Sequence, residues 1–203
     1  GAGMSYAIPA STLEALAGAP RDRPVHLLMR HSARFPIPDG EVGEDVGLTE
    51  EGVRLAGELG ALLTGRLRSV TSSPVQRCVH TGEQMLIGAG VSGEVMTSRR
   101  LGSPGPFVVD GERAWETFCQ VEYSQLMARM LADGALPGFR GIHEAVRSLV
   151  AHILTSTERP GVHVWVSHDS IVGVSLGVLL GRRSTERWPL CLEGGCLWEG
   201  QER

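Results

Sequence analysis

The feature that most constrains this chain is a pair of short apolar runs that each end in polar, chemically active residues. The runs lie at 25–29 and 162–166, and each predicts a buried strand. Between them, Leu55, Leu59 and Leu62 recur at helical spacing. Buried strands that alternate with such helices predict an α/β fold: a three-layer sandwich in which helices cover both faces of a mainly parallel central sheet.

The patterning of the remaining chain predicts the other elements. Further strands are expected at 67–71 and 95–101, with one or two edge strands within 188–198. Helices are expected at 49–63, with Thr49 as N-cap, from Pro74 to before Gly88, and at 114–132, 139–157 and 171–180. Loops rich in glycine and proline are expected at 35–47 and 102–113.

The length and composition of the chain fit one domain. With 203 residues, 42% of them hydrophobic, the sequence can bury one core but is short for two independent ones. We expect a single domain over 4–203, in which the segment 99–140 forms a small cap over the site. The residues 1–3 that precede Met4 resemble a remnant of recombinant expression.

The charge and hydropathy patterns exclude several classes of protein. The formal net charge of -4 lacks the basic excess of nucleic-acid binders, so nucleic acid is not an expected partner. No apolar stretch approaches the ~20 residues of a membrane span, and no signal peptide follows Met4. We therefore expect a cytoplasmic protein without a membrane partner. The four cysteines form no CxxC pair and are expected to be reduced thiols.

Three polar segments, at 30–34, 72–77 and 167–169, each follow a predicted strand and are expected to meet at one edge of the sheet. Arginine can grip phosphate oxygens in pairs and neutralise the charge of a phosphoryl transition state. A histidine among such cations stays neutral and nucleophilic, and a nearby carboxylate can protonate a leaving oxygen. The segments therefore predict phosphoryl transfer by a set of three arginines, two histidines and one carboxylate: Arg30, Arg34, Arg77, His31, His168 and Asp169.

These segments resemble the signatures of the histidine phosphatase superfamily, also called phosphoglycerate mutase-like, and especially its acid-phosphatase branch. "RHSARFP" resembles the RHGxRxP signature, "LTEEG" the LTxxG helix start, "SSPVQRCVHT" the SSPxxR-xxT segment and "VSHDS" the second-histidine HD motif. The resemblance implies a phosphatase in which His31 is phosphorylated and Asp169 is the general acid. It also implies that His168 acts in catalysis and, with Arg30, Arg34 and Arg77, forms the phosphate pocket. No metal and no organic cofactor are implied, and the implied partner is a small phosphorylated metabolite.

The sequence departs from the family pattern at two places. Ser32 stands where the family has glycine, so we expect a narrower or rearranged pocket floor. The cap segment is shorter than the large insertion typical of the acid-phosphatase branch, and the residues expected to reach substrate from it are Arg99, Arg100, Phe107 and Trp115.

An acidic loop bears on substrate choice. If the loop overhangs the pocket, its acids Asp39, Glu41, Glu44 and Asp45 would discourage highly anionic substrates. The sequence predicts neither the substrate nor the oligomeric state.

Several other functions fit parts of the sequence. A phosphomutase would use the same phosphohistidine, and a non-catalytic protein could bind phosphorylated ligands on the same scaffold. A metal site could involve His163, His168 and Asp169, but no HExxH spacing accompanies them. No cysteine precedes an arginine at the spacing of a cysteine phosphatase. The segment 173–177 fits the G-x-S-x-G elbow of α/β-hydrolases, yet no histidine follows it.

Overall fold

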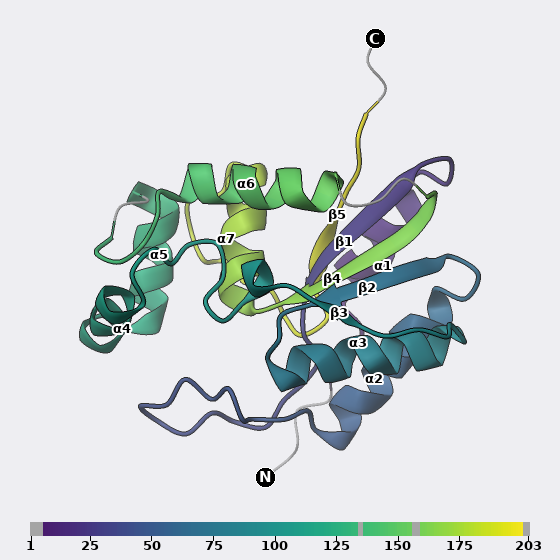
Figure 1. Cartoon of the computed structure of the whole chain (residues 1–203), viewed down its shortest axis with the longest axis horizontal. Helices are drawn as coiled ribbons and strands as arrows, with labels where there is room; N and C mark the ends of the chain where they lie inside the picture. Colours follow the sequence, from purple (N-terminus) through teal and green to yellow (C-terminus); the bar gives the residue numbers. More distant parts are fainter. Residues whose placement is uncertain (1–5, 134–135, 156–158, 201–203) are drawn as a thin grey trace.

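The computed structural model describes residues 6–133, 136–155 and 159–200. The strands within these residues form one five-stranded sheet. The strands are β1 (Pro24–Arg30), β2 (Leu67–Ser72), β3 (Met96–Thr97), β4 (Gly161–Ser167) and β5 (Gly194–Leu197). Their spatial order is β3-β2-β4-β1-β5, and all neighbours are parallel except β5, which is antiparallel to β1 (Figure 1). The predicted mainly parallel sheet is therefore confirmed.

Helices cover both faces of this sheet and complete the predicted three-layer α/β architecture (Figure 1). Successive strand residues point to opposite faces, so Leu27 and Met29 of β1 belong to one buried cluster and Leu28 to the other. The first cluster packs against α1 (Ala10–Gly18), α2 (Glu50–Leu62) and α3 (Gln76–Ala89). The second packs against α5 (Tyr123–Asp133), α6 (Ile142–Leu154) and α7 (Asp169–Leu179).

The start of α2 fixes the loop that follows β1. Thr49 caps the helix as predicted, because its Oγ1 accepts a hydrogen bond of 3.0 Å from the Gly52 N–H. A Cβ atom on Gly52 would lie 2.1 Å from the carbonyl oxygen of Ala33, so only glycine lets the helix approach this closely. The helix therefore packs directly against the segment that carries His31.

Three elements differ from the sequence-based expectation. The expected strand at 95–101 is only β3, because Ser98 caps a 3-10 turn, η1 (Arg99–Leu101), by accepting from the Arg100 N–H. The expected helix at 114–132 is two helices, α4 (Gly111–Gln120) and α5, because Val121 adopts extended backbone and packs against the second cluster. Residues 188–193 form no strand, and α1 was not expected.

The four-residue strand β5 supplies the single edge strand in that C-terminal segment. The predicted remnant at 1–3, residues 134–135 of the cap segment and the predicted helix end at 157 lie outside the described residues. Within the described residues, no helix is long and apolar enough to cross a membrane.

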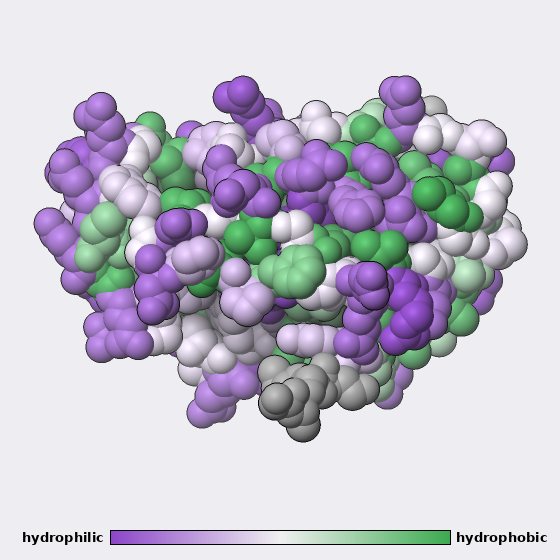
Figure 2. Space-filling model, turned by 90° about the horizontal axis from the view of Figure 1, so that it is seen from below, coloured by the Kyte–Doolittle hydropathy of each residue, from purple (hydrophilic) through white to green (hydrophobic). Residues whose placement is uncertain are grey.

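The surface seen from below mixes hydrophilic and hydrophobic residues (Figure 2). Hydrophobic residues reach the surface in several places, including the left end of the view, where α4 and α5 lie (Figures 1 and 2). The loop that follows β1 extends along the lower side of Figure 1 toward the same end of the molecule. Residues of this loop and of α4 and α5 line part of the cavity described next.

Candidate active site

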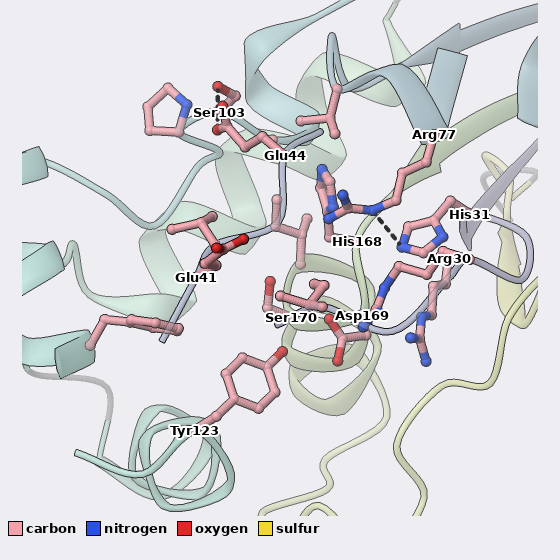
Figure 3. A pocket seen from close by; sticks show the side chains of 18 residues that line it. Arg30, His31, Glu41, Glu44, Arg77, Ser103, Tyr123, His168, Asp169 and Ser170 are labelled. Carbon is pink, nitrogen blue, oxygen red and sulfur yellow. Dashed lines mark hydrogen bonds between the residues drawn. The ribbon is translucent and has the colours of Figure 1, made fainter. Parts of the chain in front are cut away.

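The three polar segments meet at the carboxyl ends of the parallel strands, as the sequence predicts. The His31 N–H donates to the Ser167 carbonyl at 2.9 Å, and the Ser73 N–H donates to the Val166 carbonyl at 2.9 Å. These bonds extend the pairing of β4 with β1 and β2 beyond the strand ends. All six predicted side chains line one cavity of about 390 Å³: Arg30, His31, Arg34, Arg77, His168 and Asp169 (Figure 3).

His31 is held in one tautomer by its own loop. Its Nδ1 lies 2.7 Å from the carbonyl oxygen of Ser32. Since a carbonyl can only accept, Nδ1 carries the proton and Nε2 keeps its lone pair. Burial, followed by the charges of neighbouring groups that include Arg30 and Arg77, lowers the pKa of His31 well below its ordinary value. The imidazole is therefore neutral and able to act as a nucleophile through Nε2.

Arg77 lies against that nitrogen. Its Nε donates to Nε2 of His31 at 3.3 Å, and its Nη1 donates to the carbonyl oxygen of Gly43 (Figure 3). The side chain is buried, which lowers its pKa from the ordinary value, although a guanidinium keeps its charge. These two bonds hold the charged guanidinium beside the nucleophilic nitrogen, on the wall of the cavity.

The other two arginines are fixed by backbone carbonyls. Nη1 of Arg30 donates to Pro189 at 2.9 Å, and Nη1 of Arg34 donates to Phe35 at 2.9 Å. The Nε of Arg30 is buried and has no hydrogen-bond partner in the described structure. None of the salt bridges among the described residues involves these arginines, so their charge is available to an anion.

His168 stands edge-on to His31, with ring centroids 5.8 Å apart. Its Nε2 lies 2.9 Å from the Ser73 hydroxyl and 3.7 Å from the Cys78 sulfur. Burial first, then the charge of Arg77, lowers the pKa of His168 to about 4. Cys78 is a thiol rather than a thiolate, because burial raises its pKa to about 12. All four cysteines are free, as expected.

Asp169 is the first residue of α7 and is held by two residues that the sequence did not point to. The indole N–H of Trp188 donates to its Oδ2 at 3.0 Å. The Tyr123 hydroxyl, from the cap, points toward the same carboxyl group and toward Ser170 (Figure 3). Burial and the Asp169 charge raise the pKa of Tyr123, although over a third of the residue remains exposed. Neither Trp188 nor Tyr123 belongs to a sequence motif, so no signal in the sequence indicated that they lie at the site.

The Ser32 side chain does not enter the pocket, so the expected narrowing of the pocket floor by this side chain is not found. Its side chain turns toward α2 and donates to the Gly52 carbonyl at 2.6 Å, while its N–H donates to the Thr81 hydroxyl at 3.1 Å. The residue is fully buried and is not among those that line the cavity. The hydroxyl therefore ties the His31 loop to the start of α2.

Of the four residues of the segment 99–140 that were expected to reach substrate, none lines the phosphate cavity and two line the cavity beside it. Arg99 and Arg100 are exposed and line neither cavity, whereas Phe107 and Trp115 line the adjoining one. The residues that do line the phosphate cavity from the cap segment are Gly102, Ser103, Pro104, Phe118 and Tyr123.

Part of the acidic loop lines the pocket, which meets the condition for its effect on substrate choice. Glu41 and Glu44 line the cavity, and Glu44 accepts a hydrogen bond of 3.3 Å from the Ser103 hydroxyl (Figure 3). Asp39 and Asp45 are exposed and lie outside it. The loop therefore contributes two of its four carboxylates to the site.

The described structure supports neither Ser175 as an alternative nucleophile nor a metal site that includes His163. Ser175 of the G-x-S-x-G segment is fully buried within α7 and lines no cavity described here. His163 is bonded to Ser69 and to the Arg159 carbonyl rather than to the groups around His168. Among the described residues, no three His, Cys, Asp or Glu side chains cluster to hold a metal ion.

Comparisons with known proteins identify the fold and the family of the chain. No curated protein sequence matches the chain. Among solved structures, a mycobacterial glucosyl-3-phosphoglycerate phosphatase is 21% identical, with a TM-score of 0.50, over 78% of this chain and 79% of that one. A protein of Thermus thermophilus is 20% identical, with a TM-score of 0.52, over 85% and 91% of the two chains. An Entamoeba histolytica phosphoserine phosphatase, solved with 3-phosphoglyceric acid, is 18% identical, with a TM-score of 0.50, over 79% and 81%.

These structures share the fold of this chain. The family model of the histidine phosphatase superfamily (branch 1) matches residues 27–198 and so spans every polar segment of the site. The finer resemblance to the acid-phosphatase branch is not part of that match and stays a prediction. The chain belongs to the histidine phosphatase superfamily.

Proposed function

We propose that this chain hydrolyses a small phosphomonoester through a phosphohistidine formed on His31, without a metal or an organic cofactor. The observation that carries the proposal is the state of that imidazole: Nδ1 is bonded to the Ser32 carbonyl, and Nε2 faces the guanidinium of Arg77 in the cavity. A neutral, oriented nucleophile beside cations is the arrangement that phosphoryl transfer requires.

In the first step, Nε2 of His31 attacks phosphorus and the bond between phosphorus and the alcohol oxygen breaks. The arginines neutralise the charge on the equatorial oxygens, with His168 as a further contact. Asp169 gives its proton to the leaving oxygen, which departs as an alcohol. Trp188 and Tyr123 orient the Asp169 carboxyl group for that transfer.

In the second step, water attacks the phosphohistidine and the bond between phosphorus and Nε2 breaks. The Asp169 carboxylate takes one proton from the water, so inorganic phosphate leaves and the neutral imidazole and the carboxylic acid are both restored. A phosphomutase would instead return the phosphoryl group to a bound alcohol, and release of inorganic phosphate separates the two reactions.

The experiment that tests the proposal combines turnover with trapping. Phosphate release from p-nitrophenyl phosphate is expected from the natural chain and not from His31→Ala, whereas His143→Ala, which alters an exposed histidine of α6, should retain it. Brief reaction with labelled substrate and an alkaline quench should leave base-stable, acid-labile label on the His31 peptide. Label on Ser32, Ser175 or a cysteine would disprove the mechanism.

A further inference from the structure

A second cavity adjoins the phosphate pocket and continues it toward the cap. Its volume is about 550 Å³, within the ~300–1,000 Å³ of typical small-molecule sites. The two cavities share wall residues from the acidic loop, the loop after η1 and the cap, among them Glu44, Ser103, Phe118 and Tyr123. A phosphomonoester whose phosphate lies against His31 would therefore place its alcohol portion in this second cavity.

The walls of the second cavity are apolar. Six aromatic and thioether side chains from the cap are among the lining residues: Phe107, Trp115, Phe118, Met127, Met130 and Phe139. Trp115 stacks on Phe118, with ring centroids 5.4 Å apart and planes inclined by 16°. Flexible methionines and a stacked aromatic pair form a surface that favours an apolar or aromatic group.

The two cavities differ in the charge of the side chains that line them. The cations that line them, Arg30, Arg34 and Arg77, all lie in the phosphate pocket. Among the described residues that line the second cavity, Glu44 is the one charged side chain, and Glu41 of the same loop lines the phosphate pocket (Figure 3). An alcohol carrying its own carboxylate or phosphate would meet a carboxylate and no cation there, so a second negative charge is disfavoured.

We propose that the substrate is the phosphomonoester of an apolar alcohol, aliphatic or aromatic, that carries no second negative charge. This inference rests on the proposed phosphatase function and specifies the substrate class. It separates this chain from enzymes whose substrates carry a carboxylate near the phosphate, since no arginine or lysine lines the second cavity among the described residues.

The test uses substrates that share one leaving-group chemistry. Ethyl phosphate, hexyl phosphate and the phosphate ester of 6-hydroxyhexanoate all release a primary alcohol, so differences in kcat/KM report the second cavity. Burial of four more methylenes should raise kcat/KM for hexyl over ethyl phosphate by about 10- to 100-fold. The terminal carboxylate should lower kcat/KM by at least about tenfold relative to hexyl phosphate. Equal values for ethyl and hexyl phosphate, or a preference for the carboxylated ester, would overturn the inference.

Two pairs of variants assign the effects to the cavity. Glu44→Gln keeps an oxygen that can accept from the Ser103 hydroxyl but removes the negative charge. It should raise the ratio of kcat/KM for the carboxylated ester to kcat/KM for hexyl phosphate about tenfold. Asp39→Asn makes the same charge change on the same loop, outside both cavities, and should leave the ratio unchanged. Trp115→Ala should reduce the preference for hexyl over ethyl phosphate, and Trp198→Ala, an exposed tryptophan elsewhere, should not. A ratio that moves equally in both members of a pair would contradict the assignment.

A binding measurement separates this inference from the proposed function. Hexylphosphonate cannot be hydrolysed, and it should bind more tightly than ethylphosphonate by a similar factor in calorimetry. If this preference is found but no phosphate ester is turned over, the apolar site stands and the phosphatase function fails. If p-nitrophenyl phosphate is hydrolysed but both preferences are absent, the phosphatase function stands and the apolar substrate class is wrong.

Discussion

The indole nitrogen of Trp188 lies 3.0 Å from Oδ2 of Asp169 and donates a hydrogen bond to it. The same indole ring packs against Gly173, one turn further along α7, where a Cβ atom would lie 2.6 Å from the ring. The loop after α7 therefore returns to the site and fixes the orientation of the proposed proton donor. A proton transfer is efficient only when the donor is held within hydrogen-bond reach of the leaving oxygen.

Trp188→Phe is expected to lower the rate of the first step with alkyl phosphates by about tenfold, because the carboxyl group loses one fixing bond while the aromatic packing on Gly173 is largely kept. Single-turnover kinetics measures that step. The matched control, Trp198→Phe, changes an exposed tryptophan away from the site and should have no effect. An unchanged first step in Trp188→Phe would show that this hydrogen bond does not position Asp169 for catalysis.

Asp169→Asn should affect substrates according to the basicity of their leaving groups. General acid catalysis supplies ~10²–10⁴ in rate, and an alkoxide needs the proton far more than nitrophenolate does. We expect a preserved burst of nitrophenol from p-nitrophenyl phosphate and a nearly abolished first step with alkyl phosphates, both measured in single turnover. Equal losses with both substrates would mean that Asp169 is structural, and Glu41 or Glu44, the other carboxylates that line the cavity, would be tested next.

Arg34→Lys should be nearly as harmful to kcat/KM as Arg34→Ala, since a point charge cannot reproduce a planar two-donor fork. The Arg34 side chain is half-buried and already spends one donor on the Phe35 carbonyl, which sets the direction of the remaining ones. Arg54→Lys, on the exposed face of α2, serves as the control and should behave like the natural chain. Near-normal turnover in Arg34→Lys would remove this residue from the phosphate cage.

The site histidines should stay neutral well below pH 6.5. Burial lowers the pKa of His168 to about 4 and moves that of His31 in the same direction. Between pH 4 and 6.5 the unfolded chain binds protons that folded His168 does not, so its contribution to the free energy of unfolding is complete above about 6.5 and falls as the pH drops toward 4. An NMR titration of labelled histidine rings measures this directly, and a midpoint near 6.5 for His168 would contradict it.

Activity should survive chelation by EDTA, because arginines rather than a metal ion are proposed to hold the phosphate. The measurement is phosphate release from p-nitrophenyl phosphate before and after dialysis against the chelator. Loss of activity that zinc or magnesium restores would revive a metal-assisted mechanism and would require ligands beyond His168 and Asp169.

The parts of the site that the sequence predicted are those set by local pattern and strand order. His31, Arg77 and His168 each follow a strand, and parallel strands bring their carboxyl ends to one edge whatever the details of packing. The Thr49 cap was predictable for the same reason, since a capping hydroxyl acts on the first turn of its own helix. The helix break at Val121 was not, because its extended backbone depends on burial against distant helices.

The sequence by itself determined the α/β layering, the convergence of the arginines and histidines, and the family, because these depend on periodicity and on motifs read over a few residues. Only the tertiary structure decided which further residues contact those groups and what surrounds them. It turned the Ser32 hydroxyl toward Gly52, brought Trp188 and Tyr123 to Asp169, and opened an apolar cavity beside Glu44. Such contacts join residues that lie far apart in the sequence, and their geometry follows from how the two sides of the sheet pack, which local sequence does not encode.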